Sequence, residues 1–206
     1  LAERNIPFIA LGRSLTEAGH PWLDLDFEGM AQTGVDRLVQ KGHRRIGVFA
    51  PIDDINLGFV FVDSYRAALE RHGIAFDPDL VFRAYPNDRG GHEIGERVAA
   101  MPEDKRPTGF VLTNEMLTVG LYRGLYDCGI RPGADIAIIG RHSTNSQYLN
   151  PKLTCFYLSL RDLGIELAEG LLATMPAYAA HYPHGVIRRV VPLTLIEGGS
   201  DQPAKG

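Results

Sequence analysis

Apolar runs and segments of helical periodicity alternate along most of this chain, most clearly over residues 107–150. The apolar run at residues 110–112 predicts a buried strand, and apolar side chains at helical spacing predict a helix over residues 115–127. Gly129 ends that helix, because a glycine just past the last turn accepts the left-handed conformation. A second buried strand follows at residues 135–139. A strand, a helix and a strand in this order form a βαβ unit, and therefore a parallel sheet with a right-handed crossover.

The same alternation continues on both sides of this unit. The predicted strands are residues 6–11, 46–50, 80–84, 110–112, 135–139, 153–158 and 186–196, and the predicted helices are residues 28–41, 60–71, 90–101, 115–127 and 160–175. Three of these helices follow candidate N-caps, which are Asn87-Asp88, Thr113-Asn114 and Ser159. Such side chains accept hydrogen bonds from free backbone N–H groups. The βα units between residues 46 and 139 predict a doubly wound α/β core. The small, polar tail from Gly198 is expected to fray.

Polar side chains follow two neighbouring strands of the predicted sheet. Thr113, Asn114 and Glu115 come directly after one strand, and Arg141 and His142 come just after the next. Parallel strands in a βαβ unit end at the same edge of the sheet, and open α/β sheets bind their ligands at that edge. The sequence therefore predicts a ligand site there.

Composition narrows the function classes. The 206 residues carry a formal net charge of −4 and a pI near 6.0, so the chain has no basic footprint for binding DNA phosphates directly. The basic residues 43–45 follow a predicted helix end, where cations offset the helix dipole, and are too few for a phosphate groove. No apolar run is long enough to span a membrane, and the start of the chain does not resemble a signal peptide. Cys128 and Cys155 lack metal-site spacing and suit a reducing compartment, although they could also pair.

Signatures of enzymes and metal sites are absent from the sequence, which holds no GxSxG, no P-loop lysine motif and no HExxH. The glycine-rich residues 89–95 do not fit the GxGxxG spacing and are better explained by tight helix packing. His181 and His184 have no Cys or carboxylate nearby to complete a metal site. No catalytic residue, metal or cofactor is therefore expected. Polar groups at strand ends without an activated nucleophile favour binding a small molecule over transforming one.

Several segments of the chain match one known family. They are IPFIALGR (residues 6–13), GHRRI (42–46), SYRAALERHGI (64–74), PTGFVLTNE (107–115), CGIRPGADIAIIG (128–140) and LNPKLT (149–154). Their order resembles the effector-binding core of LacI/GalR-type (lac repressor-like) bacterial transcription regulators, which have the fold of the type I periplasmic binding proteins. The resemblance covers nearly the whole chain, and GHRRI and GIRPGADIAIIG are its most specific parts.

The resemblance implies a two-lobed clamp of doubly wound parallel sheets, with a chain that crosses three times between the lobes. The crossings would fall near residues 25–26, 156–157 and 191–192. The lobes would be residues 1–25 with 157–191, forming a partial N-terminal lobe, and residues 26–156 with 192–206, forming the C-terminal lobe. The family's first strands and its helix-turn-helix headpiece would precede Leu1, so the resemblance also implies a part of a longer protein.

The sequence departs from the family's pattern in the pocket that the resemblance implies. Phe61 stands where the family usually has a ligand-binding arginine, and Phe27 where it has an asparagine. The family's Asn-Asp pair is Asn114-Glu115 here, and Arg141 and His142 replace an aromatic residue and an aspartate. A buried polar group left unpaired costs about 1–3 kcal/mol, so losing the arginine and the aspartate would weaken sugar binding by orders of magnitude.

Two interpretations of these departures follow. In the first, the effector is not a typical sugar: Phe27 and Phe61 would stack on a flat or apolar ring, and Arg13, Arg141 and His142 would bind an anionic group. In the second, the pocket has decayed and the protein acts without an inducer. Phe61 alone could instead fill core space. The predicted ligand-binding residues are Arg13, Phe27, Phe61, Asn114, Glu115, Arg141 and His142.

By this resemblance the chain would sense a small-molecule effector in the cytoplasm, as part of a homodimer that binds operator DNA through the missing headpiece. The ligand would favour one arrangement of the lobes and so change the spacing of the headpieces. The alternative is a periplasmic binding protein that delivers a small, sugar-type molecule to a transporter. GHRRI and GIRPGADIAIIG favour the regulator.

Overall fold

The computed structural model describes residues 1, 4, 6–14, 19–53, 56–182 and 187–204. By its internal contacts the chain divides into two compact units, each with its own sheet. The smaller unit comprises Leu1–Asp26 and Leu158–Leu193, and the larger unit comprises Phe27–Tyr157 and Thr194–Gly206. The chain thus passes between the units at three points, beside the three crossings expected from the sequence.

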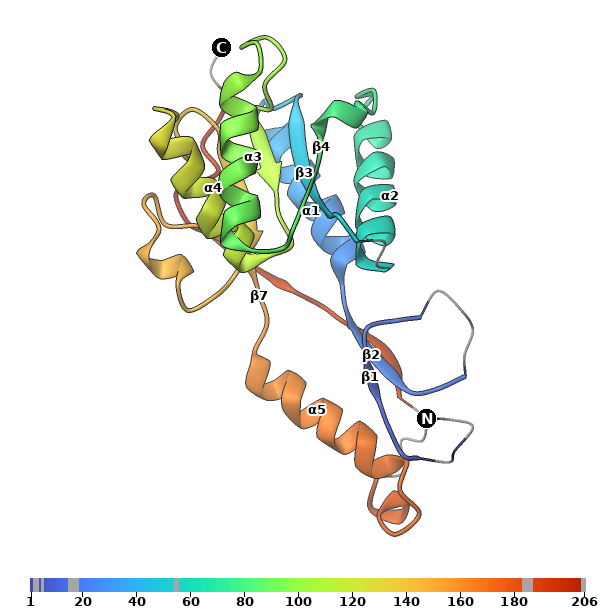
Figure 1. The fold of residues 1–206 in the computed structure, drawn as a ribbon. Coiled ribbons are helices and arrows are strands. Elements are labelled where there is room, and N and C mark those ends of the chain that lie inside the picture. Colours follow the sequence, from blue (N-terminus) through green and yellow to red (C-terminus); the bar gives the residue numbers. More distant parts are fainter. Residues whose placement is uncertain (2–3, 5, 15–18, 54–55, 183–186, 205–206) are drawn as a thin grey trace. The chain divides into compact units, whose positions relative to one another are not determined.

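The larger unit is built on a six-stranded sheet with the order β4-β3-β5-β6-β7-β9 (Figure 1). Its strands are β3 (Ile46–Pro51), β4 (Val81–Ala84), β5 (Gly109–Val111), β6 (Ala137–Arg141), β7 (Thr154–Tyr157) and β9 (Thr194–Ile196). Neighbouring strands pair in parallel except β7 and β9, which are antiparallel. Every residue of β3 and β5 is buried, as expected for parallel strands that are covered on both faces.

Helices cover both faces of this sheet. They are α1 (Phe27–Gln40), α2 (Asn56–Arg71), α3 (Asp88–Ala100) and α4 (Glu115–Asp127). α1 packs with α2 and α3 packs with α4, and Figure 1 shows the two pairs on either side of the sheet. Successive side chains of β5 point to opposite faces of the sheet and so contact different helix pairs. Phe110 belongs to the core shared with α3 and α4, whereas Val111 lies against Gly34 of α1. The predicted doubly wound α/β fold is confirmed.

α3 and α4 approach each other backbone to backbone. A Cβ atom added at Gly91 or Gly120 would collide with backbone atoms of the facing helix, and one at Gly95 would lie 2.7 Å from the carbonyl carbon of Gly124. No side chain larger than a hydrogen atom fits at these positions. The prediction that residues 89–95 serve tight helix packing is confirmed.

The segment after β9 is bound to the sheet, so the prediction that it frays is wrong. Ser200 is fully buried, and its hydroxyl forms hydrogen bonds with the backbone of both β6 and β7. Asp201 is 2% exposed and forms ion pairs with Arg37 (Nε–Oδ2, 2.6 Å) and Lys41 (Nζ–Oδ2, 2.8 Å) of the α1 region. The side chains of Ser200 and Asp201 therefore bind the protein interior instead of water.

Among the basic residues 43–45, His43 has a structural role, but not the one expected. His43 is 3% exposed, with Nε2 2.9 Å from the carbonyl oxygen of Gln202 and Nδ1 3.0 Å from Thr108 Oγ1. A carbonyl oxygen only accepts hydrogen bonds, so Nε2 carries the proton. Burial lowers the pKa of His43, which favours the neutral ring. His43 is thus a buried hydrogen-bonding residue and not a cation that offsets the helix dipole.

The smaller unit holds a three-stranded parallel sheet with the order β1-β2-β8. Its elements are β1 (Ala10–Leu11), β2 (Trp22–Leu25), β8 (Arg188–Val191) and the helix α5 (Leu160–Ala173). Its buried hydrophobic side chains include Leu23, Leu25, Leu163 and Val191. The strand predicted at residues 6–11 is largely wrong, because β1 is an edge strand that pairs with β2 only at Ala10 and Leu11.

The predicted N-caps are confirmed. The side chains of Asn87, Asn114 and Ser159 each accept a hydrogen bond from the backbone N–H three residues on, at 2.8, 2.9 and 3.2 Å. Within the described ranges, no helix has the length and apolar character needed to cross a bilayer. The same ranges contain no group of three or more His, Cys, Asp or Glu side chains that could hold a metal ion. His181 is exposed, and His184 lies outside the described residues.

Candidate ligand-binding site

Three neighbouring parallel strands of the larger unit end close together. β5 leads into Asn114, β6 ends at Arg141 and leads into His142, and β7 ends at Tyr157. The registers of β5 with β6 and of β6 with β7 bring these ends to one edge of the sheet. Polar and aromatic side chains therefore gather where open α/β sheets bind ligands.

Asn114 is held at the start of α4. Its side-chain oxygen accepts a hydrogen bond from Leu117 N at 2.9 Å, and the Thr118 hydroxyl donates to its backbone carbonyl at 2.7 Å. An asparagine amide carries two N–H donors besides that oxygen. Asn114 thus presents fixed donors beside a helix N-terminus, where the helix dipole favours negative charge.

Glu115 and Arg141 form an ion pair at this edge, with 3.1 Å between Arg141 Nη2 and Glu115 Oε1. The two side chains are only 25% and 23% exposed, so solvent screens the pair less than a surface pair. This contact uses one of the five N–H donors of the guanidinium, which is a planar fork suited to a carboxylate or phosphate. An anionic ligand would therefore share Arg141 with Glu115.

His142 is in contact with the end of β7 through both its backbone and its ring. Its backbone N–H donates to the Phe156 carbonyl at 2.9 Å. Its imidazole lies edge to face with the ring of Tyr157, with 5.1 Å between the ring centroids and an angle of 85°. Tyr157 is 38% exposed and was not among the predicted site residues. Its place at the end of the strand after His142 is the signal in the sequence that identifies it.

The two phenylalanines differ in their availability to a ligand. Phe61 is 1% exposed and lies on the same face of α2 as the buried Tyr65 and Ala68, at helical spacing. Its ring fills core space, so the expectation that Phe61 stacks on a ligand is not supported, because no face of the ring reaches the surface. Phe27 begins α1 and is only partly buried, which keeps it among the candidates.

Arg13 belongs to the smaller unit, whereas the other predicted residues belong to the larger one. Its Nε donates to Asp24 Oδ2 at 2.8 Å, and its guanidinium lies 5.8 Å from the centroid of the Trp22 ring. The side chains of Arg13 and Asp24 are 24% and 13% exposed. These contacts hold Arg13 in place within its own unit, and its role in ligand binding stays a prediction.

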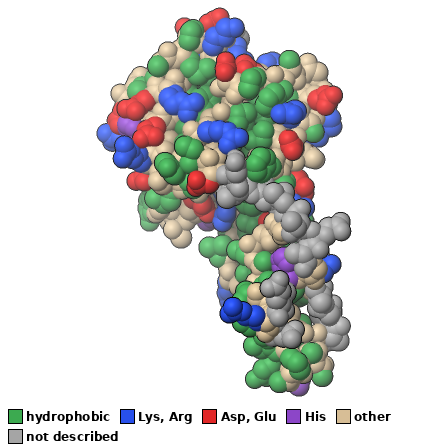
Figure 2. All heavy atoms as spheres, turned by 45° about the vertical axis from the view of Figure 1, so that its right-hand side comes forward, with side chains coloured by type: hydrophobic (Ala, Val, Ile, Leu, Met, Phe, Trp, Pro, Cys, Tyr) green, Lys and Arg blue, Asp and Glu red, His purple; other side chains and the backbone are tan. Residues whose placement is uncertain are grey.

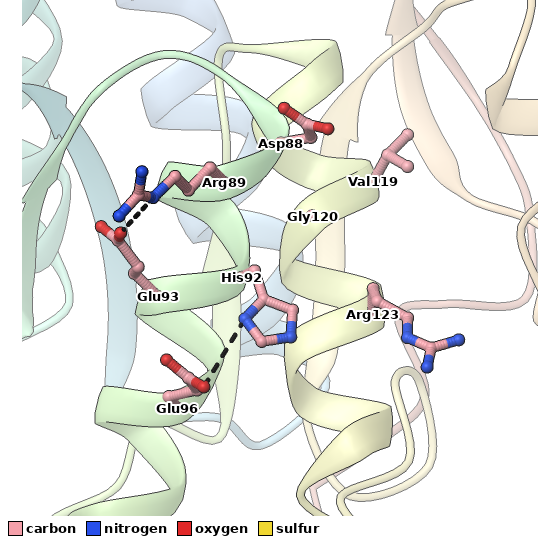
Figure 3. A pocket seen from close by; sticks show the side chains of 8 residues that line it. All are labelled: Asp88, Arg89, His92, Glu93, Glu96, Val119, Gly120 and Arg123. Atoms are coloured by element: carbon pink, nitrogen blue, oxygen red, sulfur yellow. Dashed lines mark hydrogen bonds and ion pairs between the residues drawn. The ribbon is translucent and has the colours of Figure 1, made fainter.

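A concave region lies between α3 and α4 and is lined largely by charged side chains (Figure 3). His92 points from α3 toward α4, with Nδ1 3.7 Å from Glu96 Oε1 and Nε2 3.2 Å from Asp127 Oδ2. The hydrogen bond from Arg123 lowers the pKa of Asp127. These charges pair with one another, and a solvated network of ion pairs explains this groove without a ligand.

Comparisons with known proteins agree with this geometry. The chain matches the periplasmic binding protein-like domain over residues 35–200. The probable HTH-type transcriptional repressor ExuR of Bacillus subtilis (strain 168) is 26% identical over 175 residues, which cover 84% of this chain and 52% of the relative. Catabolite control protein A of Streptococcus mutans is 31% identical over 161 residues, which cover 77% of this chain and 46% of the relative. The chain thus spans about half the length of the curated relatives it matches.

Solved structures show the same fold. A regulatory protein of the LacI family from Chloroflexus aggregans superposes with a TM-score of 0.85 at 24% identity, covering 97% of this chain and 70% of that chain. A LacI family transcriptional regulator from Enterococcus faecium, solved with bound ribose, gives a TM-score of 0.83 at 23% identity, covering 99% and 73%.

A doubly wound sheet with polar groups at its carboxyl edge, joined by three crossings to a second parallel sheet, defines a periplasmic-binding-protein-like α/β protein. The chain belongs to the periplasmic binding protein-like domain family. The curated relatives that it matches include HTH-type transcriptional regulators, so the resemblance to the effector-binding core of LacI/GalR-type regulators is confirmed.

Proposed function

We propose that this chain is the effector-sensing part of a LacI/GalR-type transcription regulator that acts in the cytoplasm as a homodimer. A small molecule at the carboxyl edge of the large sheet would favour one arrangement of the two units. The change would reach operator DNA through a headpiece outside this chain. The relatives support this proposal, since they are named as HTH-type regulators, and they do not favour the periplasmic transport alternative.

The surface of the larger unit agrees with a sensing role. Figure 2 shows Lys and Arg side chains interspersed with Asp and Glu over the face that it displays, in keeping with the net charge of −4. A surface of mixed sign gives no continuous positive path for a phosphate backbone. We therefore assign DNA binding to the headpiece and ligand binding to this chain.

The ion pair of Glu115 and Arg141 beside His142 is the observation that supports a specific ligand class. The guanidinium matches a carboxylate or a phosphate, and the donors of Asn114 at the start of α4 favour the same charge. The second oxygen of Glu115 is an acceptor for a hydroxyl group. His142, unlike the aspartate it replaces, carries no negative charge. These groups together fit a hydroxylated molecule with one anionic group, such as a sugar acid or a sugar phosphate.

Calorimetric titration with three matched sugars tests the ligand class. D-Glucose, D-glucuronate and D-glucose 6-phosphate share one ring and differ in charge. We expect at least one of the two anions to bind at least tenfold more tightly than glucose, and the two anions separate a carboxylate site from a phosphate site. His142→Ala should weaken the binding of that anion tenfold or more, because it removes a polar ring at the strand end.

His181→Ala is the matched control, since His181 is exposed in the smaller unit, and it should leave the affinity unchanged. Tightest binding of neutral glucose would refute the anionic class. Failure of all three ligands to bind would favour the interpretation that the pocket has decayed.

DNA binding requires the full-length protein that contains the headpiece. Fluorescence anisotropy with DNA from upstream of its own gene would measure operator affinity with and without the bound anion. We expect the ligand to change that affinity by tenfold or more, which corresponds to about 1.4 kcal/mol of difference between the two states. A full-length protein that binds no DNA under either condition would refute the regulator proposal.

A further inference from the structure

Tyr157 occupies a distinctive position, because it is the last residue of the larger unit before the chain enters the smaller one. Cys155 and Phe156, which precede it in β7, are each 3% exposed, whereas Tyr157 is 38% exposed. β7 therefore leaves the core at Tyr157. Its partner across the antiparallel pair of β7 and β9 is Thr194, the first residue of the larger unit after the chain returns.

The first crossing follows Asp26. A backbone hydrogen bond within the smaller unit joins it to the strand β8, which precedes the third crossing. The backbone N–H of Asp26, the last residue before the first crossing, donates to the Val191 carbonyl at 3.0 Å. The pairing of β7 with β9 thus links the second crossing to the third. The hydrogen bond between Asp26 and Val191 links the first crossing to the segment before the third. A shift of the backbone at one crossing changes hydrogen-bonded neighbours at another, which is how a hinge of few residues transmits a change.

His142 connects this hinge to the candidate ligand site. Its backbone N–H is bonded to Phe156 O at 2.9 Å, and its ring lies against the ring of Tyr157 at 5.1 Å. Arg141, which forms the ion pair with Glu115, is the preceding residue. A ligand that touches the imidazole would therefore act on a ring that packs against the last residue before the crossing. An edge-to-face pair has a defined geometry, so a rotation of one ring displaces the other.

We infer that Tyr157 is the positioning residue that couples ligand binding at His142 to the hinge, through its ring and not through its hydroxyl. This inference rests on the proposed function, because coupling requires both a ligand and a DNA response. It goes beyond that function in assigning the transmission to one aromatic contact. Binding energy at the site and coupling to the hinge are then separable by mutation.

The test measures coupling as a ratio of two dissociation constants in the full-length protein. D-Glucuronate and D-glucose 6-phosphate are titrated with and without saturating operator DNA, and the ratio of the two constants is the coupling factor. We expect Tyr157→Leu to bring this ratio at least fivefold closer to one. Tyr157→Phe should retain the ratio of the unmodified protein, because it keeps the ring. Tyr148→Leu, at a tyrosine that is 80% exposed, is the matched control and should change neither value.

The outcomes separate this inference from the proposed function. If the unmodified protein binds an anion and its ratio is far from one, the proposed function stands. An unchanged ratio in Tyr157→Leu then overturns the coupling role. A tenfold loss of affinity with an unchanged ratio also overturns it, since Tyr157 would then be a ligand contact only. If the unmodified protein binds neither anion, the proposed ligand class fails. If its ratio is one, the proposed sensing function fails. In both cases the inference fails as well.

Discussion

At the scale of single residues, one buried carboxylate holds the segment after β9 to the larger unit. Asp201 accepts hydrogen bonds from Arg37, from Lys41 and from the Thr154 hydroxyl, which lies 2.5 Å from Oδ1. Burial alone raises the pKa of Asp201, but the hydrogen bonds from these three residues outweigh it, and the pKa is lowered. The charged form of Asp201 is therefore part of the folded state.

Replacing Asp201 with Asn should destabilise the protein by about 3 kcal/mol near pH 7, the lower end for removing one partner of a buried ion pair. Arg37 and Lys41 keep 22% and 28% of their side chains exposed, which reduces the cost of leaving them unpaired. Urea denaturation measures the difference. Glu197→Gln is the control, because Glu197 is 76% exposed in its pair with Arg37, and it should cost at most about 1 kcal/mol.

The same residue predicts a pH dependence. Because its pKa is lower in the folded state than in the unfolded state, Asp201 contributes stability above the unfolded value of about 3.9. That contribution is lost as the pH falls through the folded-state pKa. The difference between the unmodified protein and Asp201→Asn should therefore shrink below about pH 4. A constant difference from pH 7 to pH 3 would contradict this explanation.

At the scale of elements, the contact of α3 with α4 depends on glycines that leave no room for a methyl group. Gly120→Ala should destabilise the protein by about 1–3 kcal/mol or more, since the added Cβ would collide with the backbone of Asp88. Gly164→Ala is a matched control in α5, where nothing lies within 4 Å of an added Cβ. It should stabilise by about 0.5–1 kcal/mol, because alanine restricts the unfolded chain. Thermal unfolding of both variants separates the two effects.

Elements with local signals were predictable from the sequence. Asn87, Asn114 and Ser159 identify helix starts, because a cap needs only residues within the same turn. The ordered structure of the segment from Gly198 was not predictable. Its polar side chains Ser200 and Asp201 bind β6, β7 and the α1 region, which are distant in the chain. The short β1 illustrates the same limit, because an apolar run does not reveal how much of it finds a partner strand.

The candidate site was predictable in part for similar reasons. Asn114, Glu115, Arg141 and His142 follow directly from the ends of parallel strands. Whether Phe61 faces the core or a ligand depends on how α2 is rotated against the sheet, and the sequence left both possibilities open. Tyr157 was missed, because its contact with His142 depends on the register between β6 and β7.

At the scale of the whole molecule, the two units differ in how their sheets are covered. Strands β3 and β5 of the larger sheet are buried at every residue, whereas Leu11 at the edge of the smaller sheet is 58% exposed. Parallel sheets are generally stable when both faces are covered. In these 206 residues taken by themselves, the smaller unit should therefore open more readily than the larger one.

Amide hydrogen exchange tests this difference within one sample. We expect amides of β3 and β5 to exchange at least about tenfold more slowly than those of β2 and β8, because local opening exposes the less covered sheet first. Exchange measured at several pH values separates opening from intrinsic exchange chemistry. Equal protection of the two sheets would mean that both units unfold together and would refute the prediction.

The binding of Ser200 and Asp201 to the large sheet has a consequence for how the protein is made. The ribosome synthesises β3 to β7 before the segment Leu158–Leu193 of the smaller unit. β9, Ser200 and Asp201, which bind β7, are synthesised after that segment. Until Asp201 has been synthesised, Arg37 and Lys41 lack their buried ion-pair partner, because it lies more than a hundred and fifty residues later in the chain. The emerging larger unit is therefore an incomplete sheet with an unpaired edge at β7, and an unpaired strand edge of this kind is prone to aggregation.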